Sequence, residues 1–384
     1  MNIAILCYPT FGGSGVVATE LGKELAFRGH KIHFISYSIP MKLKSFSDNI
    51  FFHKVEMASY PLFDFPLYSL ALASKIVEVA KFNGLDLVHA HYAIPHATSA
   101  YLAREIMTQE HLSGKNSSKL KIITTLHGTD ITLVGLEISF LPTMKFSIEK
   151  SDGVTAVSSF LKIKTISQYN ITKDIEVIPN FINPEEFRKI SNHETECLKE
   201  RYSANGEKIL VHTSNFRPLK RVTDCIRIFN EVHKKIPSKL LLIGDGPDRS
   251  ACEYLAKDLG IYNDVTFFGN QESFVEILSI ADLFLMPSQS ESFGLSALEA
   301  MACGLPVVSS NAGGLPELNQ HGETGYIAEM GDIDKMAEYT IELLQNKNKY
   351  RIFSKNARDR SLTLFTADKI IPQYESYYEK ILAG

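Results

Sequence analysis

The feature that most constrains the fold of this chain is an alternation of short apolar runs with longer stretches of helical periodicity. Such an alternation is typical of parallel strands joined by helices that cover both faces of a sheet. The clearest unit predicts a strand at 2–7, a tight Gly-rich loop at 12–15, a helix at 16–28 that ends at Gly29, and a strand at 31–36.

The alternation pauses once and then restarts. The first part predicts further strands near 85–90, 121–126, 153–157 and 175–179. A segment with Pro and Asn at 178–184, followed by a charged stretch at 194–201, marks the boundary. The second part predicts strands at 208–213, 239–243, 264–268, 282–286, 305–309 and 325–328, and a helical pattern from about 332 to the end.

The predicted fold class is therefore α/β, with two doubly wound, Rossmann-like parallel-sheet domains. We expect an N-terminal domain at 1–182, a C-terminal domain at 183–364, and a C-terminal helix at 365–384 that packs back on the N-terminal domain. A polar stretch at 115–118 is predicted to be a loop.

Composition excludes several classes of protein. Hydrophobic residues at 45% and charged residues at 22% exclude a largely disordered chain. A formal charge of -4 gives no electrostatic reason to expect nucleic acid or an anionic membrane as partner. The five cysteines lack disulfide or zinc spacing, which favours a cytoplasmic location. We find no basic leader and no apolar run of about 20 residues, and so expect neither secretion nor membrane insertion.

Two groups of polar residues follow strands in the first half. Gly12-Gly13-Ser14-Gly15 would let a ligand approach backbone amides at a helix N-terminus. It lacks the dinucleotide-binding spacing, and a tight turn without a ligand is the alternative. His127 follows a strand, where open α/β sheets bind ligands, although Thr129 or Asp130 there would also cap a turn.

Two more histidines, His89 and His91, lie on one face of a strand that ends at the same sheet edge. Paired histidines raise the question of a metal site. No third ligand is evident in the sequence, so we do not predict one.

In the second half, three cations follow a strand within five residues, at Arg217, Lys220 and Arg221. Arginine and lysine suit phosphate oxygens, and a solvated basic turn is the alternative. The turn Gly244-Asp245-Gly246-Pro247 also follows a strand, without an evident role.

The most specific pattern is Glu291 followed by Glu299, with Phe293-Gly294-Leu295 opening a helix between them. If both glutamates lay on one helix, they would be about 12 Å apart along its axis. The two catalytic carboxyl groups of a glycosidase lie only about 5 to 9.5 Å apart, so the spacing does not fit such a pair. The two glutamates are better suited to contact two ends of one elongated ligand, with helix amides aimed at the same ligand. Two surface glutamates are the alternative. The Asp332-Ile333-Asp334 motif could hold a metal, but its place before a helix favours a cap.

Taken in order, these motifs resemble the pattern of the family 4 retaining glycosyltransferases, which have the GT-B fold, over nearly the whole chain. The resemblance implies two Rossmann-like domains facing a central cleft, a sugar-nucleotide donor, retention of configuration, and no metal or other cofactor. Some segments are most similar to the members that transfer N-acetylglucosamine from UDP-N-acetylglucosamine to L-malate, the first step of bacillithiol synthesis. These segments are Cys7-Tyr8-Pro9, His89-Ala90-His91-Tyr92, Pro95-His96-Ala97, Thr124 to Asp130, and Asn215-Phe216-Arg217.

The resemblance also implies roles for residues. Catalytic roles fall to His127, Glu291, Arg217 and Lys220. Donor-binding roles fall to Gly13, Asn215, Arg217, Lys220, Gln271, Glu291, Ser292, Phe293, Gly294, Leu295 and Glu299. Acceptor-binding roles fall to Ser14, Tyr92 and Thr125, and Lys42 is a further candidate for a malate carboxylate. Asn215 stands where the family has an arginine, so which cation contacts which phosphate is left open.

The implied chemistry needs fixed cations and amides at the leaving diphosphate, where negative charge develops, and a metal is then dispensable. We expect same-face attack by the malate hydroxyl, with the leaving phosphate oxygen taking its proton. Three alternatives stay open: another acceptor such as a hexose or an inositol phosphate, a UDP-N-acetylglucosamine 2-epimerase, and a non-enzymatic nucleotide-binding regulator. A homo-oligomer is also possible.

Overall fold

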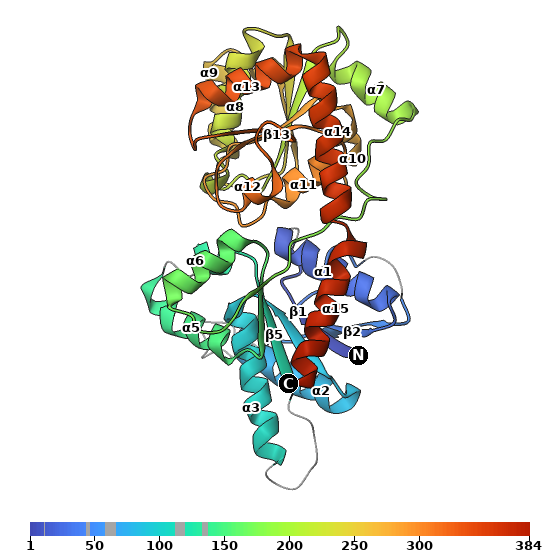
Figure 1. The fold of residues 1–384 in the computed structure, drawn as a ribbon, viewed down its shortest axis with the longest axis vertical. Helices are drawn as coiled ribbons and strands as arrows, with labels where there is room; N and C mark the ends of the chain where they lie inside the picture. The colour runs from blue at the N-terminus through green and yellow to red at the C-terminus, as the bar shows by residue number, and fades with distance from the viewer. Residues whose placement is uncertain (11, 44–46, 58–66, 112–119, 133–136) are drawn as a thin grey trace. The chain divides into compact units, whose positions relative to one another are not determined.

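In the computed structural model the chain divides into two units (Figure 1). Residues 1–10, 12–43, 47–57, 67–111, 120–132 and 137–384 are described, and the loop predicted at 115–118 lies outside them. Unit 1 comprises Met1–Pro179 together with Ile370–Gly384, and unit 2 comprises Asn180–Lys369. The chain thus leaves unit 1 close to the boundary predicted at 182/183. It returns to unit 1 within the helix predicted at 365–384.

The sheet of unit 1 has seven parallel strands in the order β3-β2-β1-β4-β5-β6-β7. The strands are β1 (Asn2–Leu6), β2 (Lys31–Ser36), β3 (Ile50–Lys54), β4 (Leu87–His91), β5 (Lys121–Leu126), β6 (Gly153–Ala156) and β7 (Glu176–Val177). The helices are α1 (Gly13–Phe27), α2 (Tyr68–Asn83), α3 (Thr98–His111), α4 (Thr129–Thr132), α5 (Leu141–Lys150), α6 (Ser159–Tyr169) and most of α15 (Ala367–Ala383).

Strand β4 shows how the sequence distributes side chains between the two faces of this sheet. Successive residues of a strand point to opposite faces. Val88 and Ala90 join a buried apolar cluster with residues of α2 and α3. His89 and His91 therefore face the other side of the sheet, where both are fully buried.

Helix α15 covers part of that second face. The Tyr377 hydroxyl accepts a hydrogen bond from the Val154 amide at 2.9 Å and lies 3.1 Å from the Val154 carbonyl oxygen. The Tyr378 hydroxyl lies 2.7 Å from Nδ1 of His89. The last helix of the chain is therefore fastened to β6 and β4 of the first sheet, and Figure 1 shows it in the same unit as β1 and β5.

The sheet of unit 2 has six parallel strands in the order β10-β9-β8-β11-β12-β13. The strands are β8 (Lys208–Thr213), β9 (Ser238–Ile243), β10 (Val265–Gly269), β11 (Leu283–Met286), β12 (Val307–Ser310) and β13 (Gly325–Ala328). The helices are α7 (His193–Tyr202), α8 (Val222–His233), α9 (Arg249–Asp258), α10 (Val275–Ile280), α11 (Leu295–Ala302), α12 (Leu315–Leu318), α13 (Ile333–Gln345) and α14 (Lys347–Leu364).

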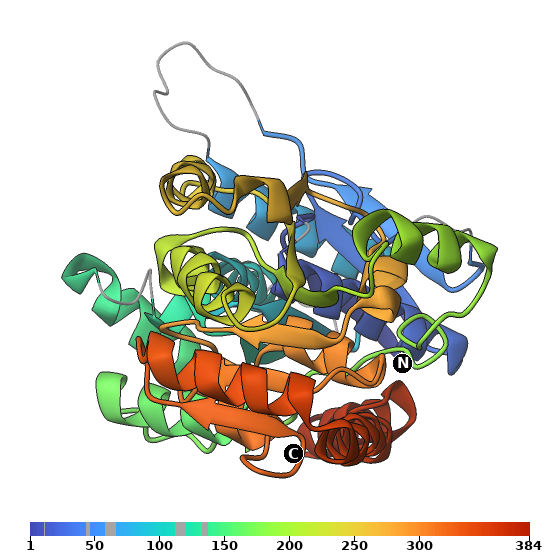
Figure 2. The ribbon, with the colours of Figure 1, turned by 90° about the horizontal axis from the view of Figure 1, so that it is seen from above.

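Helices cover both faces of this second sheet. Residues of α8, α9 and α13 form one buried cluster with the strands, and Figure 1 shows these helices on one side and α7, α10 and α14 on the other. Helix α13 contacts the edge strand β13, beside which it lies in Figure 2. In each sheet the strand order reverses beside the first strand of that unit, β1 or β8. Ligands of open α/β sheets bind at the carboxyl ends of strands near such a reversal.

Three local features bear on the sequence predictions. Strand β3 was not predicted, and helix α1 begins at Gly13, so the loop predicted at 12–15 is largely the first turn of a helix. The Asp332 side chain accepts a hydrogen bond from the Lys335 amide at 3.0 Å, which confirms that Asp332 caps α13. Within the described ranges, no helix combines the length and apolar character needed to cross a membrane.

Candidate active site

The carboxyl ends of β1, β4 and β5 bring several predicted residues of unit 1 together. Gly13 and Ser14 lie on the first turn of α1. The Ser14 hydroxyl is 2.5 Å from the hydroxyl of Tyr92, which directly follows β4. Two of the three predicted acceptor residues are therefore in direct contact.

Tyr92 has an unusual backbone conformation. Its φ is 102°, in a region of backbone conformation that residues other than glycine rarely adopt. Its amide donates to the carbonyl oxygen of Thr125 at 3.0 Å, and its ring lies 5.6 Å from that of His127. Such strain persists only where surrounding contacts hold it, and it is concentrated at functional sites.

The predicted catalytic histidine is bonded to a second histidine. Nε2 of His127 lies 2.8 Å from Nδ1 of His91, and the two rings are stacked with centroids 5.0 Å apart. Burial lowers the pKa of His127 to about 3 and the pKa of His91 well below 6.5. Both rings are therefore neutral at pH 7. Among the described residues, no group of three or more metal-ligating side chains is present.

The third predicted acceptor residue, Thr125, is fully buried in β5. Its hydroxyl lies 2.6 Å from Nε2 of His89 and 2.6 Å from the hydroxyl of Thr155. These contacts leave no surface of Thr125 for an acceptor. The structure therefore places Thr125 behind the site, where it supports His89.

In unit 2 the three predicted cations have different surroundings. Arg221 pairs with buried Asp224 at 2.5 Å, which fastens it to the first turn of α8. Lys220 pairs with Glu291 at 2.6 Å. The side chain of Arg217 is exposed and makes no hydrogen bond or ion pair with any part of the chain that the structure describes, while its carbonyl oxygen accepts from the Lys220 amide at 2.8 Å. Of the three, Arg217 is the one whose charge is uncompensated.

Glu291 is a buried carboxylate just before α11. Its Oε1 accepts from Ser288 at 2.8 Å as well as from Lys220. Its backbone oxygen accepts from the Gly314 amide at 2.9 Å. A Cβ atom at Gly313 would lie 1.9 Å from that same oxygen, so only glycine allows this approach.

Helix α11 carries the remaining predicted donor residues. It begins at Leu295, directly after Phe293 and Gly294, so its first amides lie beside the predicted ligand contacts. Glu299 lies within the helix and is 9% exposed. Because Glu291 precedes the helix, the two glutamates do not share it.

A residue that was not predicted, His212, fixes the loop that carries Asn215 and Arg217. Its Nδ1 donates to the Leu285 carbonyl oxygen at 2.8 Å. Since a carbonyl only accepts, Nε2 of His212 must accept from the Ser214 hydroxyl, 2.8 Å away. The only sign of this role in the sequence is a polar ring within the buried strand β8.

Asn215 and Gln271 are exposed. The Gln271 amide donates to the Phe268 carbonyl oxygen at 2.9 Å. Ser292 and Leu295 are half-buried, and Phe293 is buried.

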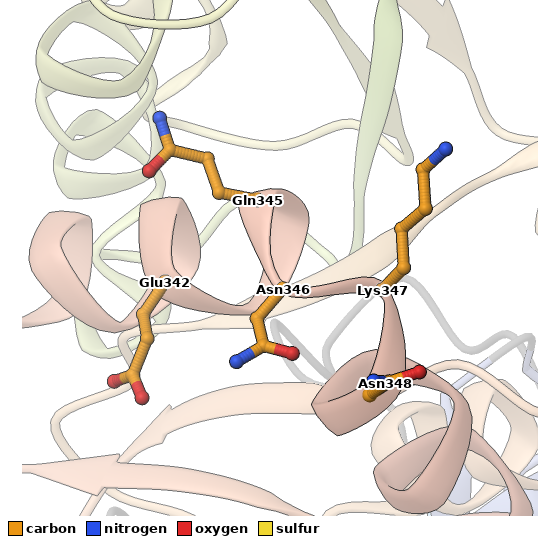
Figure 3. Close-up of a pocket in the computed structure, with 5 residues that line it drawn as sticks. All are labelled: Glu342, Gln345, Asn346, Lys347 and Asn348. Carbon is orange, nitrogen blue, oxygen red and sulfur yellow. The ribbon is translucent and has the colours of Figure 1, made fainter.

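A surface hollow lies elsewhere on unit 2, at the junction of α13 and α14 (Figure 3). It is lined by Glu342, Gln345, Asn346, Lys347 and Asn348, none of which is a predicted site residue. The side chains of Glu342 and Gln345 point in different directions, so these groups do not converge on a common point.

Two protein-family descriptions match the chain. "Glycosyltransferase Family 4" matches residues 11–186 and "Glycosyl transferases group 1" matches residues 195–360. N-acetyl-alpha-D-glucosaminyl L-malate synthase from Bacillus anthracis is 45% identical over 382 residues, which cover 100% of this chain and 97% of that protein.

Solved structures agree on the fold. A glycosyltransferase from Rickettsia africae has a TM-score of 0.82 at 22% identity, covering 99% of this chain and 98% of that one. Anabaena Alr3699/HepE, in complex with UDP-glucose, has a TM-score of 0.81 at 20% identity, covering 99% of this chain and 100% of that one.

The two parallel sheets and these matches define a sugar-nucleotide-dependent glycosyltransferase with the α/β GT-B fold, which confirms the predicted fold class. The chain belongs to glycosyltransferase family 4.

Proposed function

We propose that this protein transfers N-acetylglucosamine from UDP-N-acetylglucosamine to the hydroxyl of L-malate with retention of the α configuration, the first step of bacillithiol biosynthesis. The observation that carries the proposal is the 45% identity, over the full chain, to a synthase named for that product. Anabaena HepE, a relative in fold, binds UDP-glucose, which supports a UDP-sugar as donor.

The donor is assigned chiefly to unit 2. Arg217, exposed and uncompensated, is proposed to neutralise the diphosphate together with the amides at the start of α11. Lys220 and Glu291 are proposed to act as a pair, with Glu291 contacting the sugar. Glu299 is proposed to hold the ribose, and Gln271 and Asn215 to contact the remaining donor groups. From unit 1, Gly13 is proposed to contact the diphosphate.

The transfer step breaks the bond between the anomeric carbon and the diphosphate oxygen. Negative charge develops on the departing UDP, so fixed cations and amide hydrogens stabilise the transition state more than the ground state. The departing phosphate oxygen takes the proton of the malate hydroxyl as that hydroxyl bonds to the same face of the sugar. Because the pKa of His127 is lowered to about 3, its ring is suited to hydrogen bonding rather than to carrying charge.

The acceptor is assigned to unit 1. One of the contacting hydroxyls of Ser14 and Tyr92 donates to the other, and the remaining O–H of the pair is proposed to donate to a malate oxygen. Lys42, on the segment after β2, is proposed to pair with a malate carboxylate. Thr125 is proposed to act through His89 rather than by touching malate.

Mass-spectrometric product detection tests this proposal. Purified protein is incubated in EDTA with UDP-N-acetylglucosamine and, separately, L-malate, D-malate, an inositol phosphate and simple sugars. We expect an N-acetylglucosamine adduct and UDP release with L-malate only. Turnover with a different acceptor would contradict the malate assignment, release of a 2-epimer without acceptor would indicate an epimerase, and loss of activity in EDTA would contradict metal independence.

Two substitutions separate binding from turnover. Glu299→Ala should weaken UDP binding at least tenfold, because it removes the proposed ribose contact. His127→Ala should leave UDP affinity within about twofold and lower kcat by about 10² or more. UDP titration calorimetry and initial rates give the two readouts. If Glu299→Ala and His127→Ala lowered UDP affinity to the same extent and kcat to the same extent, the separate roles would be contradicted.

A further inference from the structure

The hydrogen bond between His91 and His127 raises the question of which nitrogen of His127 carries hydrogen. In a neutral imidazole one nitrogen donates and the other accepts. Nδ1 of His91 and Nε2 of His127 are 2.8 Å apart, so one of the two must be the donor. The choice fixes the tautomer of both rings.

The surroundings of His91 decide between the two arrangements. Nε2 of His91 is fully buried and has no hydrogen-bond partner within the described part of the chain. If Nδ1 accepted, the hydrogen of His91 would sit on Nε2 as a buried donor without an acceptor. Orphaned buried N–H groups are rarer in proteins than acceptors with unused lone pairs. The favoured arrangement therefore has Nδ1 of His91 donating to Nε2 of His127.

The ring of His91 is held in place by neighbouring residues. His96 donates from Nδ1 to the His91 carbonyl oxygen at 2.6 Å. The ring of His89 lies 4.4 Å from that of His91, and His89 is itself bonded to Tyr378 and Thr125. These contacts connect α15, β4 and the end of β5, and they pack around the ring whose Nδ1 faces Nε2 of His127.

We propose that His91 is a positioning residue that keeps His127 in the tautomer with hydrogen on Nδ1, so that His127 offers a neutral N–H donor to the substrate. The substrate contact rests on the proposed function. The tautomer does not, because it follows from contacts within unit 1.

Two nearly isosteric substitutions test the donor. His91→Asn places a side-chain amide near the position of Nδ1, and His91→Leu has a similar shape without a hydrogen-bonding group. The control is His33→Leu, which removes a buried histidine of the same sheet that is bonded to His53 instead.

The first readout is nitrogen NMR of protein labelled with ¹⁵N-histidine, without substrate, with the His127 signals identified by their loss in His127→Gln. We expect hydrogen on Nδ1 of His127 in the wild type, in His33→Leu and in His91→Asn, and a shift toward Nε2 in His91→Leu. A wild-type His127 with hydrogen on Nε2 would overturn the proposal. So would an unchanged tautomer in His91→Leu. The wild-type spectrum decides even if a variant does not fold.

The second readout is kinetic. We expect His91→Leu to lower kcat at least tenfold and to change the donor KM by no more than about threefold. In His91→Asn the decrease in log kcat should be at most half of the decrease in His91→Leu. Equal kcat values for the two variants would overturn the positioning role. If the wild type transferred nothing to L-malate, the proposed function would fail, while the NMR result would still decide the tautomer.

Discussion

At the scale of single residues, the ion pair between Lys220 and Glu291 shows that the charge of Lys220 is already balanced by a protein carboxylate without any ligand. Glu291 is 8% exposed, and a buried carboxylate is costly unless a cation and hydrogen bonds compensate it. Lys220 and Ser288 supply both. Lys220 therefore stabilises the folded unit, apart from the donor-binding role proposed for it.

Lys220→Met should lower the free energy of unfolding by about 3 kcal/mol, because it leaves the Glu291 carboxylate buried without a cation. In a Glu291→Gln background the same substitution should cost less than half as much. Urea unfolding of the four proteins in this double-mutant cycle gives the coupling. Lys234→Met is the control, because Lys234 and Glu231 form an exposed pair at 2.6 Å and should contribute less than about 1 kcal/mol. If Lys220→Met lowered the free energy of unfolding equally in the wild type and in the Glu291→Gln background, the coupling would be refuted.

The sequence identified residues at strand ends but not their partners. His127, Arg217 and Glu291 were predicted as site residues because ligand-binding groups of a doubly wound fold follow its strands. The bonds from Lys220 to Glu291 and from His91 to His127 join residues far apart in the chain, and only the packing of strands brings them together. Thr125 was expected to contact the acceptor, but its side chain is fully buried and its hydroxyl contacts His89 and Thr155.

At the scale of elements, the loop after β8 depends on a neighbouring turn. Gly244 has a φ of 117°, and a Cβ atom there would lie 1.8 Å from the Ser214 carbonyl oxygen. The loop that carries Asn215 and Arg217 can therefore keep its path only if residue 244 has no side chain.

Gly244→Ala should cost about 3 kcal/mol or more of stability and weaken UDP binding at least tenfold, because the loop must move. Gly206→Ala is the matched control. Its φ is also positive, at 80°, but nothing lies within 4 Å of the added Cβ atom, so only backbone strain of about 1 kcal/mol is expected. Urea unfolding and UDP titration give both readouts. The interpretation is wrong if the two variants lose equal stability.

Most strands were predicted because strands buried on both faces read as continuous apolar runs. Strand β3 was missed for a related reason: it is an edge strand with no buried residue, so Ile50–Lys54 carries neither a long apolar run nor clean alternation. The start of α1 was placed late because glycine is a poor helix former, although a first turn tolerates it.

At the scale of the whole molecule, buried neutral histidines are distributed unequally between the two units. In unit 1 burial lowers the pKa of His33 and His96 to about 4 and that of His89 and His127 to about 3. In unit 2 burial lowers the pKa of His212 to about 4. Acid should therefore act more strongly on unit 1.

We expect unit 1 to lose more stability than unit 2 between pH 7 and pH 5. Below about pH 6.5 the histidines of the unfolded chain become protonated, whereas those of the folded chain stay neutral until about pH 3 to 4. The free energy of unfolding therefore falls as the pH falls from about 6.5 to about 4. Each of the buried histidines His33, His89, His96 and His212 contributes up to about 2 kcal/mol of loss by pH 5, and the half-buried His127 contributes less. The measurement is hydrogen exchange, corrected for the intrinsic effect of pH on exchange rates. The loss of protection in peptides from β4 and β5 is compared with the loss in peptides from β8 and β11. Equal losses in both units would contradict the expectation.

The return of the chain to unit 1 also sets an order during synthesis. Residues Asn180–Lys369 form a unit of their own, whereas unit 1 needs Ile370–Gly384 to complete the face that holds His89. Chains emerge from the ribosome N-terminus first, and domains fold as units. The half of the enzyme that is translated first is therefore completed last, and a chain that ended at Lys369 would contain every residue of unit 2 but lack part of unit 1.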